Sequence, residues 1–266
     1  DFKKISSSDT LFEKIIPANK NLKLILSKPA SNYKWNDIFF DNNNNSINFN
    51  YSSKNQLVMK SKKLSKFEIN NHLLIEGDNL IVSDLKGNII VFSITKNKII
   101  QKYNFYKKRY KKLKKFLNLI VENDIIYVSD NLGYFYAFDY KKNSVIWAKN
   151  FNIPFRSNLK LNDDKIFTVD HQNNLYFLKK KGGDKLNKIP TEESKLNNDF
   201  KNNLALNNVS LYFLNTYGSL YSVDTRSGRI KWFRNFNQSL DVNSSNLFNG
   251  NEIVFHNEKI IVSSNN

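Results

Sequence analysis

Residues 215–232 read NTYGSLYSVDTRSGRIKW, with glycines at 218 and 228 and a tryptophan at 232. Gly218 follows a short apolar run, which is typical of a tight turn between strands because glycine takes positive φ without steric cost. An alternating strand comes next, then a polar turn at Gly228, and the last strand carries Trp232. The stretch therefore predicts consecutive antiparallel strands joined by short turns.

The same pattern occurs elsewhere in the chain, in SDLKGNIIVFSITKNKIIQ from Ser83 and SDNLGYFYAFDYKKNSVIW from Ser129. A weaker copy begins at Asp164, where Asn173 stands at the glycine position. The aligned positions Gly87, Gly133, Asn173 and Gly218 are 46, 40 and 45 residues apart. A period of this length indicates a repeat architecture.

Each copy, with one short apolar strand before it, predicts four antiparallel strands, which is one blade of a β-propeller. So small a sheet needs a neighbouring sheet on each face to bury its apolar side chains. We therefore predict an all-β propeller in which the glycines form turns, the aromatics fill the space between blades, and each tryptophan closes the seam to the next blade. The repeat residues that carry this prediction are Gly87, Gly133, Gly218, Tyr136, Tyr221, Gly228, Trp147 and Trp232.

The ends of the chain are less regular than its middle. We expect residues 1–55 to form a leader that includes a flexible, low-complexity loop without chemistry, DNNNN at 41–45, and residues 56–266 to form the propeller. The count is four full blades plus partial ones: residues 57–60 as a closing strand, and residues 252–255 and 259–263 as half a blade. Since half a blade leaves an apolar edge unpaired, we expect the chain to continue beyond Asn266; the alternative is a small ring closed by combining the two ends.

Composition narrows the class of function. The formal net charge is +17, but Lys is in excess along the whole chain and Arg is scarce, which disfavours nucleic-acid recognition. The most basic stretch is YKKRYKKLKK, residues 106–115, which is either a solvated loop or a site for anionic surfaces. No apolar run approaches the roughly 18 residues of a membrane span.

The order Gly218, Leu220, Tyr221, Asp224, Gly228, Trp232 resembles the PQQ-like β-propeller repeat, and the resemblance covers residues 68–266. Within that superfamily the chain looks most like the BamB family, the propeller lipoproteins of the bacterial outer-membrane β-barrel assembly machinery. The resemblance implies an eight-bladed, non-catalytic periplasmic scaffold, tethered to the outer membrane through a lipidated cysteine that this sequence lacks. Its implied partner is the periplasmic part of the barrel-assembly subunit.

The resemblance also implies partner-binding residues. One family loop is matched by Ile153, Phe155 and Arg156; a second is matched by Asp199, although Lys201 replaces its second acid. The alternative for the first loop is packing, with Phe155 in the seam and Arg156 on backbone carbonyls of neighbouring blades.

An enzyme of the same superfamily, a PQQ-dependent dehydrogenase, is the other alternative. The chain has no cysteine for the vicinal disulfide of many such enzymes and no convincing acidic cluster for a hard cation. Its three histidines stand in unrelated contexts. We therefore expect no catalytic, cofactor-binding or metal-binding residues.

Overall fold

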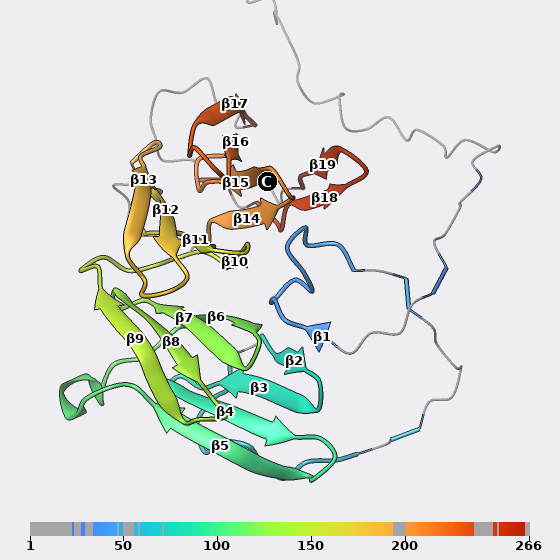
Figure 1. Cartoon of the computed structure of the whole chain (residues 1–266), viewed down its shortest axis with the longest axis vertical. Coiled ribbons are helices and arrows are strands. Elements are labelled where there is room, and N and C mark those ends of the chain that lie inside the picture. Colours follow the sequence, from blue (N-terminus) through green and yellow to red (C-terminus); the bar gives the residue numbers. More distant parts are fainter. Residues whose placement is uncertain are drawn as a thin grey trace, which may run out of the picture.

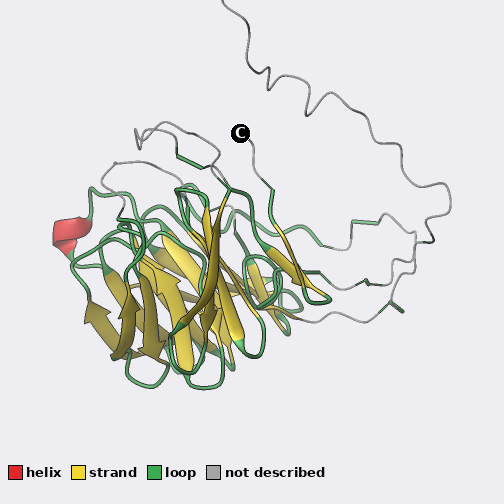
Figure 2. Cartoon of the chain, turned by 90° about the horizontal axis from the view of Figure 1, so that it is seen from above, coloured by secondary structure: helices red, strands yellow, loops and turns green. Residues whose placement is uncertain are grey.

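The computed structural model describes residues 23, 28–29, 34–46, 48–49, 56–57, 59–70, 72–193, 201–236, 247–248 and 250–263. Their strands form separate antiparallel sheets that follow one another around a common centre (Figure 1). Seen from above, strands of successive sheets stand side by side (Figure 2). The prediction of an all-β propeller is confirmed. No helix within the described ranges is long and apolar enough to cross a membrane.

Four sheets are full blades and one is partial. Blade one contains β2 (Leu74–Glu76), β3 (Asn79–Ser83), β4 (Asn88–Ser93) and β5 (Lys98–Asn104), with β1 (Lys34–Trp35) added beside β2. Blade two contains β6 (Leu117–Glu122), β7 (Ile125–Asp130), β8 (Tyr134–Asp139) and β9 (Ser144–Asn150). Blade three contains β10 (Lys160–Leu161), β11 (Lys165–Val169), β12 (Leu175–Lys179) and β13 (Lys185–Ile189). Blade four contains β14 (Asn203–Leu206), β15 (Ser210–Leu214), β16 (Ser219–Asp224) and β17 (Ile230–Asn235), and the partial blade contains β18 (Val254–His256) and β19 (Lys259–Ile261).

The turn between the second and third strands has the same construction in every full blade. Gly87, Gly133, Asn173 and Gly218 all take positive φ, between 64° and 88°. Three residues before each of them, a buried Asp or Asn accepts two backbone N–H groups through Oδ1, at 2.8–3.0 Å. These residues are Asp84, Asp130, Asp170 and Asn215. The side chain therefore satisfies donors that a buried tight turn would otherwise leave unpaired.

Apolar side chains from neighbouring blades form a separate core in each seam. Tyr136 of blade two packs with blade one, and Tyr221 of blade four packs with blade three. Blades two, three and four each take part in two of these cores, so both of their faces are buried, which is the physical requirement that a single blade cannot meet.

The two repeat tryptophans differ. The Trp147 ring packs in the seam of blades two and three, its Nε1 donates to the carbonyl of Lys180 at 3.0 Å, and Gly183 lies directly against it. Trp232 is 43% exposed, so the prediction that it closes a seam is wrong for this residue. Its nearest ring is Tyr212 of its own blade. Among the described residues the partial blade has only β18 and β19, and no outer strand lies against Trp232.

Residues 36–45, which we call the axial segment, lie where the inner strands of the blades converge (Figure 1). The Asn36 carbonyl accepts from Val121 of β6, the Asn42 carbonyl accepts from Leu206 of β14, and the Asn43 carbonyl accepts from Phe255 of β18. Asn44 Nδ2 donates to the carbonyls of Leu204 and Ile253 at 2.9 and 2.7 Å. The expectation that 41–45 is a flexible loop without chemistry is therefore wrong.

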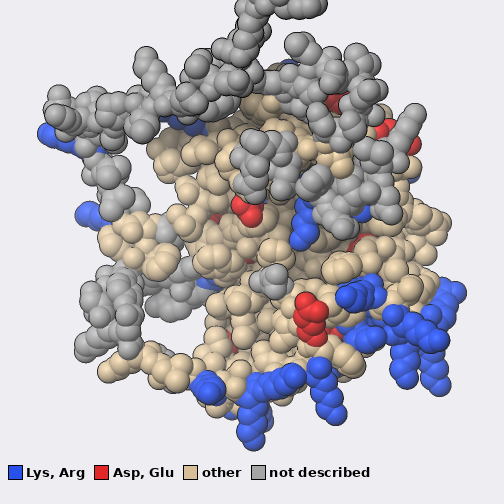
Figure 3. Space-filling model, turned by 180° about the vertical axis from the view of Figure 1, so that it is seen from behind, with Lys and Arg blue, Asp and Glu red and all other residues tan. Residues whose placement is uncertain are grey.

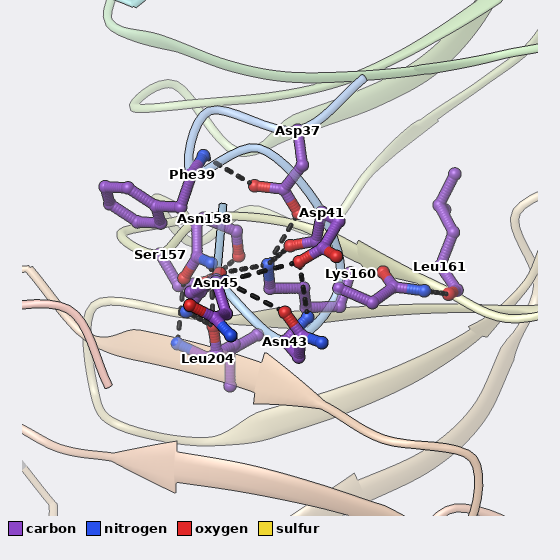
Figure 4. A network of polar contacts seen from close by, with 12 residues as sticks. Asp37, Phe39, Asp41, Asn43, Asn45, Ser157, Asn158, Lys160, Leu161 and Leu204 are labelled. Atoms are coloured by element: carbon purple, nitrogen blue, oxygen red, sulfur yellow. Dashed lines mark hydrogen bonds and ion pairs between the residues drawn. The ribbon is translucent and has the colours of Figure 1, made fainter. Parts of the chain in front are cut away.

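A buried ion pair fixes this segment (Figure 4). Lys160 of β10 donates through Nζ to Asp37 Oδ2 at 2.6 Å, to the Asp41 carbonyl at 2.8 Å and to Asn44 Oδ1. The Lys160 side chain is 0% exposed and that of Asp37 is 3% exposed. Burial raises the pKa of Asp37 and lowers the pKa of Lys160, and each charge opposes the shift of the other. The site is stable only while both charges stay paired.

Two predictions concern the first sixty residues. The prediction of a closing strand at residues 57–60 is wrong for the described positions there, which belong to no strand. The division of the chain at residue 56 stays a prediction, although β1 and the axial segment, both on the leader side of it, pack onto the blades.

Candidate functional site

The connection between blades two and three holds the predicted contact residues Ile153, Phe155 and Arg156. Phe155 is 3% exposed, and its ring packs edge-on against Phe135 at 5.6 Å and against Tyr176 at 5.9 Å. Of the two interpretations left open for Phe155, this geometry favours packing in the seam. Ile153 and Arg156 are half-buried and form the accessible part of the connection.

Arg156 joins this connection to the one before blade four. Its N–H donates to the Val169 carbonyl and its carbonyl accepts from the N–H of Asn202, both at 2.9 Å. Ser157 and Asn202 form a parallel bridge next to it. The structure therefore brings the first implied loop beside Lys201, in the second implied loop. Asp199 lies outside the described residues.

Gly133 determines how closely the first connection approaches blade two. Its φ is +88°, and a Cβ placed on it would lie 2.9 Å from the backbone nitrogen of Ile153. The Gly133 carbonyl also accepts the N–H of Phe151 at 2.8 Å. Since only glycine fits both constraints, the turn of blade two positions the loop that carries Ile153.

A polar hollow of about 280 Å³ lies beside these connections, near the convergence of the inner strands. It is lined by Ile38, Phe39, His72, Asn118, Asn158, Lys201, Asn202, Asn203, Gly250, Asn251 and Glu252. Each full blade and the partial blade contribute a residue that lies in the first two positions of the inner strand or one or two residues before it. Burial lowers the pKa of His72 and the charge of Lys201 lowers it further, whereas the charges of Glu252 and Asp37 oppose this shift.

Charged side chains of both signs lie at this end of the molecule. Burial and the charge of Arg156 lower the pKa of His171. Arg156 and Lys201 are cationic, whereas Glu252 is an acid on the rim of the hollow. Within the described ranges, no three His, Asp or Glu side chains are grouped to hold a metal ion.

The sequence did not lead us to predict a role for Asp37 or Lys160. A signal existed for Lys160, because the inner strands of blades two, three and four read NLIV, NLKL and NLAL. Lys160 stands where its sister blades have Ile120 and Ala205, and a lysine at a core position needs a buried partner. The sequence does not identify that partner, which lies 123 residues away.

Blades of four antiparallel strands, stacked around an axis and connected by exposed loops at one end, define the class: a β-propeller. No protein-family model matches the sequence, and no curated protein is detectably similar to it. Among solved structures, the chain is similar to BamB from Moraxella catarrhalis, with a TM-score of 0.61 and 14% identity over 73% of this chain and 57% of that one. It is also similar to the computationally designed Ika4 protein, with a TM-score of 0.48 and 10% identity over 68% of this chain and 99% of that one. The similarity to BamB is one of fold, and the chain spans a little over half the length of that structure.

Proposed function

We propose that the protein is a non-catalytic scaffold of outer-membrane β-barrel assembly, which binds the barrel-assembly subunit in the periplasm through its interblade loops. The support for this is the BamB-like fold together with the adjacency of the two implied loops. Arg156 and Lys201 come from connections 45 residues apart and are joined through the bond between Asn202 and Arg156. Loops held on a stiff scaffold are where recognition residues belong.

The proposed contact surface consists of Ile153, Arg156 and Lys201, with Phe155 beneath it. A half-buried aliphatic beside an arginine is typical of an interface anchor, and hydrogen bonds from the N–H groups of Phe155 and Arg156 fix the loop before a partner arrives. Little conformational entropy is then lost on binding. Attachment to the outer membrane through an N-terminal lipid is part of the same proposal and comes from the resemblance alone.

Site-specific photo-crosslinking in an envelope extract tests this surface. A photoreactive residue at Ile153 and another at Lys201 should capture the same subunit, identified by mass spectrometry. The matched control is Leu186, an exposed apolar residue on β13 outside the surface. Capture of the subunit from Leu186 as efficiently as from Ile153 would contradict the proposal.

Arg156→Ala gives the energetic test. We expect the affinity for the captured subunit to fall by roughly tenfold or more, as for an interface arginine. Circular dichroism and the unfolding midpoint should stay close to those of the original protein. A fully folded Arg156→Ala variant that binds its partner with unchanged affinity would rule out this role.

The absence of catalysis is tested separately. Incubation with pyrroloquinoline quinone and calcium, followed by absorbance titration, should give no saturable spectral change. Stoichiometric quinone binding would instead support the dehydrogenase alternative.

A further inference from the structure

The basic loop, residues 106–115, joins β5 to β6 and contains a 3₁₀ turn, η2 (Lys108–Tyr110). It projects at the edge of the molecule (Figure 2), and basic side chains gather around this side (Figure 3). Its exposed basic residues are Lys107, Lys108, Arg109, Lys111, Lys112 and Lys114. Within the described part of the chain, the five lysines of this set form no ion pair. Their charge is therefore left for a ligand.

The loop is anchored from beneath by aromatic side chains. Tyr106 donates its hydroxyl to Asp130 at 2.5 Å, and the hydroxyls of Tyr110 and Tyr134 lie 2.8 Å apart. Phe105, just before the loop, stacks on Tyr136 with centroids 4.4 Å apart. A loop that only carried solvated lysines would not need these aromatic contacts. A loop that is already fixed in place loses less conformational entropy when it binds a ligand.

Lys115 helps to hold the loop in place from its buried side. It is buried, and its Nζ donates to the Tyr110 carbonyl at 2.5 Å. The acids closest to the loop are buried too: Asp84 and Asp130 are held by their own turns and by Ser65 and Tyr106. The outer surface of the loop is therefore positive without local neutralisation.

Apolar side chains accompany these charges. Leu113 is 47% exposed and Phe116, directly after the loop, is 53% exposed. Lysines with exposed aliphatic and aromatic side chains are the composition of segments that bind at a membrane interface. The only guanidinium of the loop, that of Arg109, already donates to Tyr134 and lies over the Tyr110 ring. It is therefore not free to bind a base or phosphate through two parallel hydrogen bonds.

We propose that the basic loop docks on an anionic phospholipid bilayer, with its lysines among the headgroup phosphates and Leu113 and Phe116 at the headgroup–acyl boundary. The loop combines lysines without ion pairs, exposed apolar side chains and fixed aromatic contacts beneath it. This combination favours a lipid surface as the ligand over a nucleic acid. This activity is separate from the proposed partner binding and does not depend on it.

Vesicle flotation tests the proposal. The probe is a vesicle of three parts phosphatidylethanolamine to one part phosphatidylglycerol, compared with a vesicle of phosphatidylcholine alone. We expect binding to the anionic vesicle at about 50 mM salt and release at about 500 mM, where screening is strong. Failure to bind the anionic vesicle at low salt, or equal binding to both vesicles, would overturn the proposal.

Charge reversal locates the site. Replacing Lys107, Lys108, Lys111 and Lys112 by Glu should weaken partitioning by at least about 100-fold. The matched control replaces Lys179, Lys181, Lys185 and Lys188 by Glu. These four lysines are also exposed and form no ion pair with any described residue, so the control lowers the net charge equally from +17. The control should stay within about threefold of the original protein. Equal losses in the two variants would mean that net charge alone, and not the loop, causes binding.

Two further experiments test the contribution of the apolar side chains and the alternative that the loop binds nucleic acid. Leu113→Ser with Phe116→Ser should reduce partitioning by roughly tenfold and leave its salt dependence unchanged, because only apolar burial is lost. Single-stranded and duplex DNA at the same phosphate concentration should compete poorly with vesicles. Tighter binding to DNA than to vesicles, lost in the loop variant, would reassign the loop to nucleic acid and overturn the lipid proposal.

Discussion

Single residues with unusual backbone requirements account for most of the agreement between sequence and structure. The glycine positions of the repeat are positive-φ turns, and Asn173, the substitute in the weakest copy, takes the same conformation at φ 64°. The buried Asp or Asn three residues earlier is equally regular, but its function becomes visible only when the two N–H donors are seen around it. The pattern of Asp or Asn followed three residues later by Gly or Asn can therefore be found in the sequence. Its physical reason, the pairing of two backbone N–H groups, requires the structure.

Gly133→Ala should destabilise the protein by about 3 kcal/mol, because the methyl group adds positive-φ strain and a clash with the backbone of Ile153. Gly77→Ala is the control, since φ there is +58° and no atom lies within 4 Å of the added Cβ. We expect about 1 kcal/mol for this change, measured by urea unfolding. Equal losses at the two glycines would show that Gly133 is not under steric constraint.

The two tryptophans should respond differently to truncation. Trp147→Ala removes a ring packed in a seam together with its hydrogen bond to Lys180, and should cost about 3 kcal/mol. Trp232→Ala, at a 43% exposed position, should cost less than about 1.5 kcal/mol. Urea unfolding measures both changes in the free energy of unfolding. A larger destabilisation by Trp232→Ala than by Trp147→Ala would contradict the described packing.

At the scale of elements, each blade was predictable and the connections between distant elements were not. Alternation and turn residues fix strands locally, so the four strands of blades one to four follow from the repeat. The bulge between the third and fourth strands was not predicted, although it falls four residues after the turn position in every full blade, at Val91, Ala137, Phe177 and Ser222. The axial segment was not predicted, because most of its contacts with the blades cross more than 100 residues of sequence and its composition is that of a loop.

The buried pair of Asp37 and Lys160 predicts a strong asymmetry between single and double substitution. Asp37→Asn or Lys160→Met alone leaves an uncompensated buried charge and should cost roughly 3–5 kcal/mol. The double variant Asp37→Asn/Lys160→Met removes both charges and should be more stable than either single variant. Thermal or urea unfolding gives the double-mutant cycle, and additive losses would contradict a direct pairing.

Across the whole molecule, the seams make each blade depend on its neighbours, and the axial segment links the inner strands of blades two to four and the partial blade. Blade order and seam composition could be derived from the sequence, because the same apolar alternation recurs in each copy. The contact surface could be derived only in part. The resemblance pointed to two loops, whereas their adjacency through Arg156 and Asn202 depends on the angle between blades three and four.

The central claim is that the blades stabilise one another and are held together by the axial segment. Hydrogen exchange followed by mass spectrometry, compared between the original protein and Lys160→Met, tests this claim most directly. We predict that the variant loses amide protection together in the inner strands β6, β10, β14 and β18, because all four are bound by the axial segment. Loss confined to β10, with unchanged protection in the other three strands, would contradict the account.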